Sequence, residues 1–339
     1  MYFREGRTNV RFGGLNDDAI SISGSCFGYG SHTAGAADAQ SYPTKPIRFI
    51  VAVPPGGSTD TLSRLVGQKL GESLGQQVVV DNRPGAHGLI GLEMASKAAP
   101  DGYTLVGGGT ASMTINPSLY KKLPYDPVKH FAPVVLIAYS SSVLVVNPSI
   151  PVKNIAELIA RAKAKPGDFR YASAGIGSSP HLSAEVFRTM TGVDILHVPY
   201  TGATQGVTAT VSGETSMMFT GVASAIAQIK SGRLRALSVN GPKRSPALPE
   251  VPTASESGLP GFEVDFWIGI FVPTGTPREV ITKLNSEANR IVNAPEVKEK
   301  LLTLGTDPVG GTPAQFAAIV RKDLERWAKT VKASGMKME

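Results

Sequence analysis

The feature that most constrains the fold is a regular alternation of short apolar runs with amphipathic helical segments. Residues 47–53 (IRFIVAV) form a continuous apolar run, which is typical of a parallel strand buried on both faces. A turn rich in Pro and Gly follows, and then leucine and valine recur on one helical face. The strand pattern returns at 77–81 and 103–107, with a short helix expected at 89–98. This order predicts a doubly wound α/β layer with right-handed crossovers.

Two long extended runs separate this set from a second one. The runs 132–139 and 142–147 are interpreted as a crossing between domains, and 266–272 as the partner crossing that returns. The second alternating set contains helices at 155–163, 182–190, 204–212 and 223–230 and strands at 169–174, 194–198, 217–220 and 236–239. After the second crossing only helices are expected, at 278–292, 296–304 and 313–333.

The fold class predicted from this pattern is α/β, with two doubly wound α/β domains joined by a hinge. Residues 1–41 are expected to be a leader or disordered tail. Domain 1 is expected to be discontinuous, formed by 42–140 and 268–339, and domain 2 to be formed by 141–267. Such a hinge leaves a cleft between the domains that closes around a ligand.

Composition excludes several other classes of protein. The 339 residues contain one cysteine, Cys26, so a disulfide-stapled scaffold is impossible. No stretch approaches the roughly 18 consecutive apolar residues of a membrane-spanning helix. The net charge of +7 comes from scattered Lys and Arg, which indicates a solvated basic surface and no nucleic-acid partner.

The first forty residues differ from the rest of the chain. They are rich in Gly, Ser, Ala and Asn, and Ala37-Asp38-Ala39 has the form of a signal-peptide cleavage site. The apolar region of a signal peptide is missing, because Asp17 and Asp18 interrupt the segment. Cys26 is interpreted as an incidental thiol of this tail.

Two strand-to-helix turns carry the functional prediction, residues 54–60 (PPGGSTD) and 173–181 (SAGIGSSPH). Both place glycines and hydroxyls at a helix N-terminus, where free N–H groups and the helix dipole favour a carboxylate or phosphate. In open α/β sheets, ligands bind beyond the carboxyl ends of the strands. The alternative is that both are ordinary glycine turns with Ser or Thr N-caps.

Nucleotide, metal and catalytic motifs are missing, so no cofactor and no metal are expected. The second turn has Pro180 where a dinucleotide fingerprint needs its third glycine, and the first lacks the P-loop lysine. There is no G-x-S-x-G or H-E-x-x-H sequence. His181 beside Ser178 or Ser179 keeps open a two-domain enzyme acting on an acidic metabolite, and a ligand sensor that feeds a signalling partner is a further alternative. We interpret the chain as a binding protein that is not an enzyme.

Other strand ends add neutral candidates, and Asp60 is expected to complement the helix dipole. This set favours a ligand with carboxylates and no amine. The candidate ligand-binding residues are Pro55, Gly56, Gly57, Ser58, Thr59, Asp60, Thr110, Ala111, Ser173, Ala174, Gly177, Ser178, Ser179, His181, Tyr200, Thr204 and Thr220.

Several motifs resemble one known family. They are 42–47 (YPTKPI), 54–60 (PPGGSTD), 81–86 (DNRPGA), 100–105 (PDGYTL) and 197–200 (HVPY). In this order they resemble the solute-binding proteins of tripartite tricarboxylate transporters, also called Bug proteins after the Bordetella uptake genes. The resemblance runs from about Tyr42 to the C-terminus.

The resemblance implies a periplasmic-binding-protein-like (type II) Venus flytrap that works in the periplasm, and we expect a monomer. Its ligand would be a small organic carboxylate, a di- or tricarboxylate or an aromatic acid, delivered to the membrane components of the transporter. It also implies that Gly56 to Thr59, with Ser173, Ala174, Gly177 and Ser178, hold the ligand through amides, hydroxyls and water. One departure is Thr220, where many relatives have Asp, and a second is the lack of a recognisable signal peptide.

Overall fold

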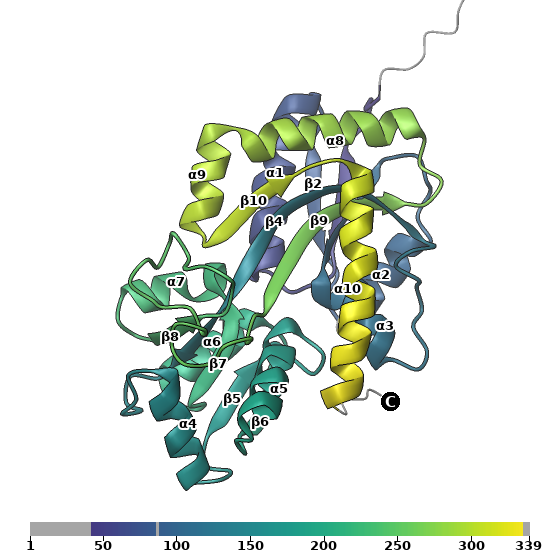
Figure 1. The fold of residues 1–339 in the computed structure, drawn as a ribbon. Coiled ribbons are helices and arrows are strands. Elements are labelled where there is room, and N and C mark those ends of the chain that lie inside the picture. Colours follow the sequence, from purple (N-terminus) through teal and green to yellow (C-terminus); the bar gives the residue numbers. More distant parts are fainter. Residues whose placement is uncertain (1–41, 86–87, 335–339) are drawn as a thin grey trace, which may run out of the picture. The chain divides into compact units, whose positions relative to one another are not determined.

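The computed structural model describes residues 42–85 and 88–334 (Figure 1). The expectations for the leader, including those for Cys26 and Ala37-Asp38-Ala39, lie outside these residues. Within the described residues, none of the helices combines the length and the apolar character that a membrane crossing requires.

The strands form one ten-stranded sheet in the order β2-β1-β3-β9-β4-β7-β5-β6, with β8 and β10 also paired to β4. Strand β1 pairs in parallel with β2 and β3, and β5 pairs in parallel with β6 and β7. All the other pairings are antiparallel. The strands are β1 (Ile47–Val51), β2 (Val78–Asn82), β3 (Thr104–Gly109), β4 (Phe131–Val146), β5 (Arg170–Ser173), β6 (Leu196–Pro199), β7 (Met217–Gly221), β8 (Arg235–Val239), β9 (Asp265–Pro273) and β10 (Thr306–Gly310).

We call the part built on β1, β2, β3, β9 and β10 the first lobe and the part built on β5 to β8 the second lobe (Figure 1). The predicted α/β alternation is confirmed in both, while the domain bounds remain a prediction. The helices are α1 (Ser58–Leu74), α2 (Leu89–Ser96), the π-helix η2 (Ala111–Ile115), α3 (Asn116–Leu119), α4 (Ile155–Ala164), α5 (Ser179–Thr191), α6 (Ala203–Ser212), α7 (Val222–Lys230), α8 (Arg278–Asn293), α9 (Pro295–Thr303) and α10 (Pro313–Ser334).

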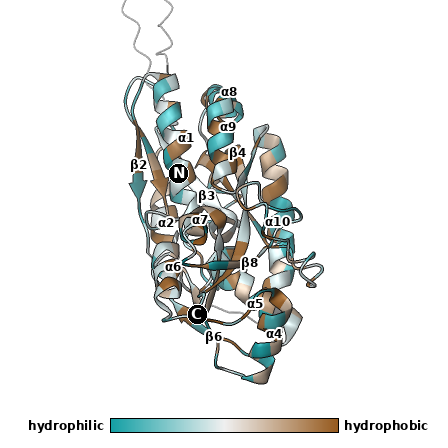
Figure 2. Ribbon diagram, turned by 90° about the vertical axis from the view of Figure 1, so that its left-hand side faces the viewer, coloured by the Kyte–Doolittle hydropathy of each residue, from teal (hydrophilic) through white to brown (hydrophobic). Residues whose placement is uncertain are grey.

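Apolar layers cover both faces of the sheet. In the first lobe, Val66 of α1 and Leu284 of α8 pack with the strands on one face. On the other face, Leu92 of α2 and Phe316 of α10 pack around Trp267. Figure 2 shows hydrophobic colours along the central strands, whereas α4 and α8 carry hydrophilic colours toward solvent. In the second lobe, α4 and α5 belong to one core cluster and α6 and α7 to another, so each lobe is an α/β/α sandwich, as the continuous apolar runs predict.

Strand β4 joins the two lobes. The predicted pair of runs, 132–139 and 142–147, is one strand of 16 residues, so the predicted break between them is wrong. Its first part pairs with β9 as far as Ser141 opposite Asp265, and its last part pairs with β7 from Ser142 onward. Ser142 stays in the strand because its buried hydroxyl has a partner: the Asn240 side chain donates to Ser142 Oγ at 3.0 Å.

The expectation that only helices follow the second crossing is also wrong. Strand β10 lies between α9 and α10 and pairs with β4. Pro308 cannot donate a ladder hydrogen bond, and an edge strand tolerates that loss. Gly305 before the strand and Gly310 at its end have φ of +70° and +77°, so the segment has the composition of a turn although it forms a strand.

Helix α10 contacts both lobes. Phe316 and Val320 belong to the first-lobe core, whereas Trp327 belongs to a core cluster that contains second-lobe side chains. The Trp327 ring stacks on Phe266 with centroids 6.2 Å apart. Helices α8 and α9 pack on first-lobe elements, whereas α10 packs on both lobes, and the assignment of 268–339 to domain 1 stays a prediction.

Gly269 of β9 tests how tightly this core is packed. A Cβ at this position would meet the Phe316 ring and would lie 2.8 Å from the Val135 carbonyl oxygen. We expect Gly269→Ala to lower the free energy of unfolding by about 1–3 kcal/mol, the usual cost of overpacking. Urea denaturation of Gly269→Ala, Phe316→Leu and the double variant measures this cost. If the double variant is not less destabilised than the sum of the single variants, the clash with Phe316 is not its cause.

Candidate functional site

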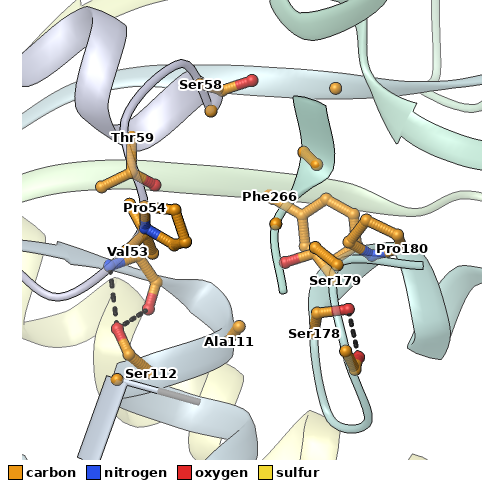
Figure 3. A pocket seen from close by; sticks show the side chains of 18 of the residues that line it. Val53, Pro54, Ser58, Thr59, Ala111, Ser112, Ser178, Ser179, Pro180 and Phe266 are labelled. Atoms are coloured by element: carbon orange, nitrogen blue, oxygen red, sulfur yellow. Dashed lines mark hydrogen bonds between the residues drawn. The ribbon is translucent and has the colours of Figure 1, made fainter. Parts of the chain in front are cut away.

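The carboxyl ends of parallel strands from both lobes face one cavity of about 780 Å³ (Figure 3). Pro54, Ser58 and Thr59 lie on one side of the view, and Ser178, Ser179 and Phe266 on the other. This is the position at which open α/β sheets bind ligands. The lining residues are 52–54, 57–59, 84–85, 88, 107, 109–112 and 266–268 from the first lobe, Ser140 at the crossing, and 174–180, 199–203, 220–221 and 224 from the second.

Helix N-termini dominate the electrostatics of this cavity. Helices α1, α6 and α7 begin after Gly57, Gly202 and Gly221, and none of the three has a side-chain cap. Each start carries free N–H groups and the positive end of a helix dipole, equivalent to roughly +0.5 charge. None of the described lining residues is Asp, Glu, Lys, Arg or His. The first turns of α6 and α7 contain no acidic residue, so their positive potential is left for an anionic ligand, whereas Asp60 lies in the first turn of α1.

The first turn is held from behind by Asp60. This buried carboxylate accepts hydrogen bonds from the Gly56 amide at 2.9 Å, from Asn82 Nδ2 at 2.8 Å and from Arg64 Nε at 3.1 Å. Burial alone would raise the pKa of Asp60, but these hydrogen bonds and the Arg64 charge outweigh it and lower the pKa. The positive φ of +88° at Gly56 requires glycine there. Asp60 thus fixes the turn and leaves the N-terminus of α1 open.

The second turn uses most of its amides internally. The Gly175 amide donates to Ser173 Oγ at 3.0 Å, and the Gly177 amide donates to His181 Nδ1 at 3.0 Å. Ser178 caps α5 and its hydroxyl donates to the Gly175 carbonyl at 2.6 Å. The two turns are therefore not equivalent, although the sequence suggested a matching pair. The first presents an uncapped helix start, and the second presents a rigid surface.

An aromatic stack of buried Tyr171 and His181 with half-buried His197 supports the second turn. The ring centroids of Tyr171 and His197 are 4.8 Å apart, and those of His197 and His181 are 4.3 Å apart. His197 Nε2 shares a hydrogen bond of 2.6 Å with Ser173 Oγ, and the Tyr171 hydroxyl donates to Glu185 at 2.7 Å. Burial, together with the neighbouring His181, lowers the pKa of His197 to about 4. His197 is therefore neutral at physiological pH.

The structure brings most of the sequence-predicted residues to the cavity. Those that line it are Gly57, Ser58, Thr59, Thr110, Ala111, Ala174, Gly177, Ser178, Ser179, Tyr200 and Thr220. Those outside the lining are Pro55, Gly56, Asp60, Ser173, His181 and Thr204. Asp60, Ser173 and His181 are placed behind the two turns, where their hydrogen bonds fix the backbone.

Sequence reasoning missed two lining residues at the strands that join the lobes. Ser140 of β4 and Phe266 of β9 line the cavity at the crossing between the lobes. Within the described residues, the buried hydroxyls of Ser140 and Thr220 have no hydrogen-bond partner. The two extended crossings were the signal that could have located these residues, because a cleft between two lobes is closed at the strands that join them. Among the described residues, no group of three or more His, Cys, Asp or Glu could hold a metal ion.

The neutral state of His197 gives a prediction on pH. Its pKa is about 4 in the folded chain against 6.5 as the ordinary value, so the unfolded chain takes up the proton first. The stability that His197 contributes is complete above pH 6.5 and is lost as the pH falls toward about 4. The Gln side chain of His197→Gln does not titrate in this range. Between pH 6.5 and about 4, the melting temperature of this variant should therefore fall less than that of the unsubstituted chain. Carboxylates titrate in both proteins and serve as the internal control; equal losses would contradict the prediction.

Comparison with known proteins places this cavity in context. The sequence profile described as the tripartite tricarboxylate transporter family receptor matches residues 62–336. Protein BugT of Bordetella pertussis is 37% identical over 311 residues, which cover 91% of this chain and 95% of BugT. The UPF0065 protein in the tcbD-tcbE intergenic region of Pseudomonas sp. strain P51 is 42% identical over 291 residues, 86% of each chain.

Solved structures share the fold. The periplasmic binding protein BugD superimposes with a TM-score of 0.83 at 32% identity, covering 88% of this chain and 100% of BugD. An R. palustris protein with adipate has a TM-score of 0.85 at 35% identity, covering 87% and 99%. MatC from Rhodopseudomonas palustris with bound malate has a TM-score of 0.81 at 31% identity, covering 86% and 100%. The fold is therefore the two-domain Venus flytrap of periplasmic binding proteins.

Proposed function

Since the chain belongs to the tripartite tricarboxylate transporter family of receptors, we propose that it captures a small organic carboxylate between its lobes in the periplasm. It then delivers this ligand to the membrane components of a tripartite transporter. In this proposal the protein works as a monomer and performs no chemistry on its ligand.

The observation that carries the proposal is the uncharged cavity surrounded by uncapped helix starts. Three helices direct free N–H groups at it, and no described lining residue carries a charge. A carboxylate can accept hydrogen bonds from these N–H groups directly, and hydrogen bonds to a charged partner contribute about 1.5–3 kcal/mol each. The adipate and malate bound in two structural relatives support the same ligand class.

The lining also indicates the rest of the ligand. Phe266, Pro54 and Pro180 give the cavity an apolar body (Figure 3), which suits the chain or ring of an organic acid. No described lining residue is acidic, so an ammonium group would have no counter-charge. We therefore propose an aromatic acid or a di- or tricarboxylate without an amine.

The hydrogen bonds of the second turn speak against the alternative enzyme. A nucleophilic Ser178 would need a base at its hydroxyl. The Ser178 hydroxyl instead donates to the Gly175 carbonyl, and the His181 ring accepts from the Gly177 amide. These two side chains are therefore used to build the turn.

The direct test is the thermal shift of the full chain with malate, adipate, citrate and benzoate, each paired with its neutral amide. A ligand present at about 100 times its Kd adds roughly 2.7 kcal/mol to the stability. We expect at least one acid to raise the melting temperature and its amide to have no effect. If no acid stabilises the protein, or if the amides stabilise it equally, the carboxylate proposal is wrong.

Gly57 separates stability from binding. Its φ of −78° suits any residue, and a Cβ there meets nothing within 4 Å. Gly57→Asp would place a capping carboxylate on the start of α1, so we expect it to raise the stability by a few tenths of a kcal/mol and to abolish acid binding. Gly57→Asn is the matched neutral cap, and it should weaken binding less because it does not repel the ligand. Calorimetric titration checks both; unchanged affinity in Gly57→Asp would exclude α1 from the site.

A further inference from the structure

The two lobes touch across the cavity at positions occupied by glycine. An added Cβ at Gly202, the N-cap of α6, would lie 3.2 Å from Cγ and 3.3 Å from Cβ of Pro54 in the first turn. An added Cβ at Gly221, the N-cap of α7, would meet the Ser58 hydroxyl and would lie 3.2 Å from Ser140 Oγ. Both glycines are in the second lobe and both neighbours, Pro54 and Ser58, border the cavity in the first (Figure 3).

Backbone conformation does not explain these two glycines. Gly202 has φ −170° and ψ 166°, and Gly221 has φ −66° and ψ 140°, which any residue adopts. Glycine is also not the strongest N-cap, because Ser, Asp and Asn stabilise a helix start better. The close approach of the first turn does explain them, because a Cβ at Gly202 would stand 3.2 Å from the rigid Pro54 ring and a Cβ at Gly221 would displace the Ser58 hydroxyl. This differs from Gly56, whose φ of +88° already requires glycine.

We propose that Gly202 and Gly221 are positioning residues that allow the lobes to close. Their bare backbone lets the first turn seat against the starts of α6 and α7, so that three helix N-termini reach one bound ligand. A side chain at either position would hold the lobes apart and leave the N–H groups of α1 too far from the other two. The nature of the ligand rests on the proposed function, but the contact itself can be tested without any ligand.

The contact is tested by disulfide trapping in the full chain. In a Cys26→Ser background, Pro54→Cys removes the ring Cγ that a Gly202 side chain would meet, and Gly202→Cys then places two Cβ atoms 3.3 Å apart, close to the roughly 3.5–4.5 Å of a disulfide. We expect mild oxidation to form this bond within one molecule, detected by mass spectrometry of the linked peptides and by gel mobility. The matched control pairs Pro54→Cys with Ser212→Cys. Ser212 lies at the far end of the ten-residue helix α6, about 15 Å along the helix from Gly202.

Absence of the cross-link in Pro54→Cys with Gly202→Cys, or equal trapping in the control, would overturn the inference. The second measurement is Gly202→Val, compared with Ser212→Val. Without ligand, Gly202→Val should have the melting temperature of the unsubstituted chain. It should lose the stabilisation by carboxylates, and its radius of gyration in small-angle scattering should be larger than that of the unsubstituted chain. Full retention of ligand stabilisation would also overturn the inference. If no carboxylate binds the unsubstituted chain, the proposed function fails while the cross-link still decides the contact.

Discussion

The antiparallel pairing of β4 with β9 sets the geometry of the whole molecule. Strand β4 belongs to both lobes, and it pairs with β9 as far as Ser141 before it pairs with β7 and β8. Each lobe adds a parallel triplet, β2-β1-β3 on one side and β7-β5-β6 on the other. Because these strands end at the region where β4 and β9 pass from one lobe to the other, their carboxyl ends share one cavity. The helices that follow α/β strands necessarily begin there, so the topology alone gathers the helix starts.

In the proposed function, the gathered helix starts bind an anion without a cation among the described lining residues. A Lys or Arg in the cavity would need desolvation and would lose side-chain entropy on binding. Backbone N–H groups are already fixed by the helix, so the ligand orders little that was free before. The first turn depends on this logic most, because Asp60, Arg64 and Asn82 hold it from behind while none of the described lining residues is charged. The basic surface of the chain then contributes only by steering anions toward the cavity.

Local sequence patterns predicted the alternation and both turns, because buried strands and glycine-rich helix starts depend on neighbouring residues. They failed where the outcome depends on distant partners. Ser140–Ser142 looked like a break in β4, yet Asn240, far along the chain, satisfies Ser142. Residues 306–310 looked like a turn, yet β4 supplies their ladder. Ser140 and Phe266 were not assigned to the site, although the predicted pairing of the two crossings places β4 and β9 side by side at the cleft. Ser173 and His181 were predicted as ligand contacts because sequence cannot distinguish a residue that lines a turn from one that supports it.

The two turns differ in how their helix starts are capped: α5 has a side-chain cap and α1 has none. In the second turn, Ser178 caps α5 and the stacked rings of His181 and His197 lock the backbone, so its shape costs little entropy to maintain. In the first turn, Gly57 forgoes the stabilisation of a side-chain cap, a difference of only a few tenths of a kcal/mol, and keeps the α1 amides free. The same reasoning applies to Gly202 and Gly221, where the missing side chain also gives space to the opposite lobe. A small loss of helix stability at three N-caps is thus what both the proposed anion site and the proposed closure require.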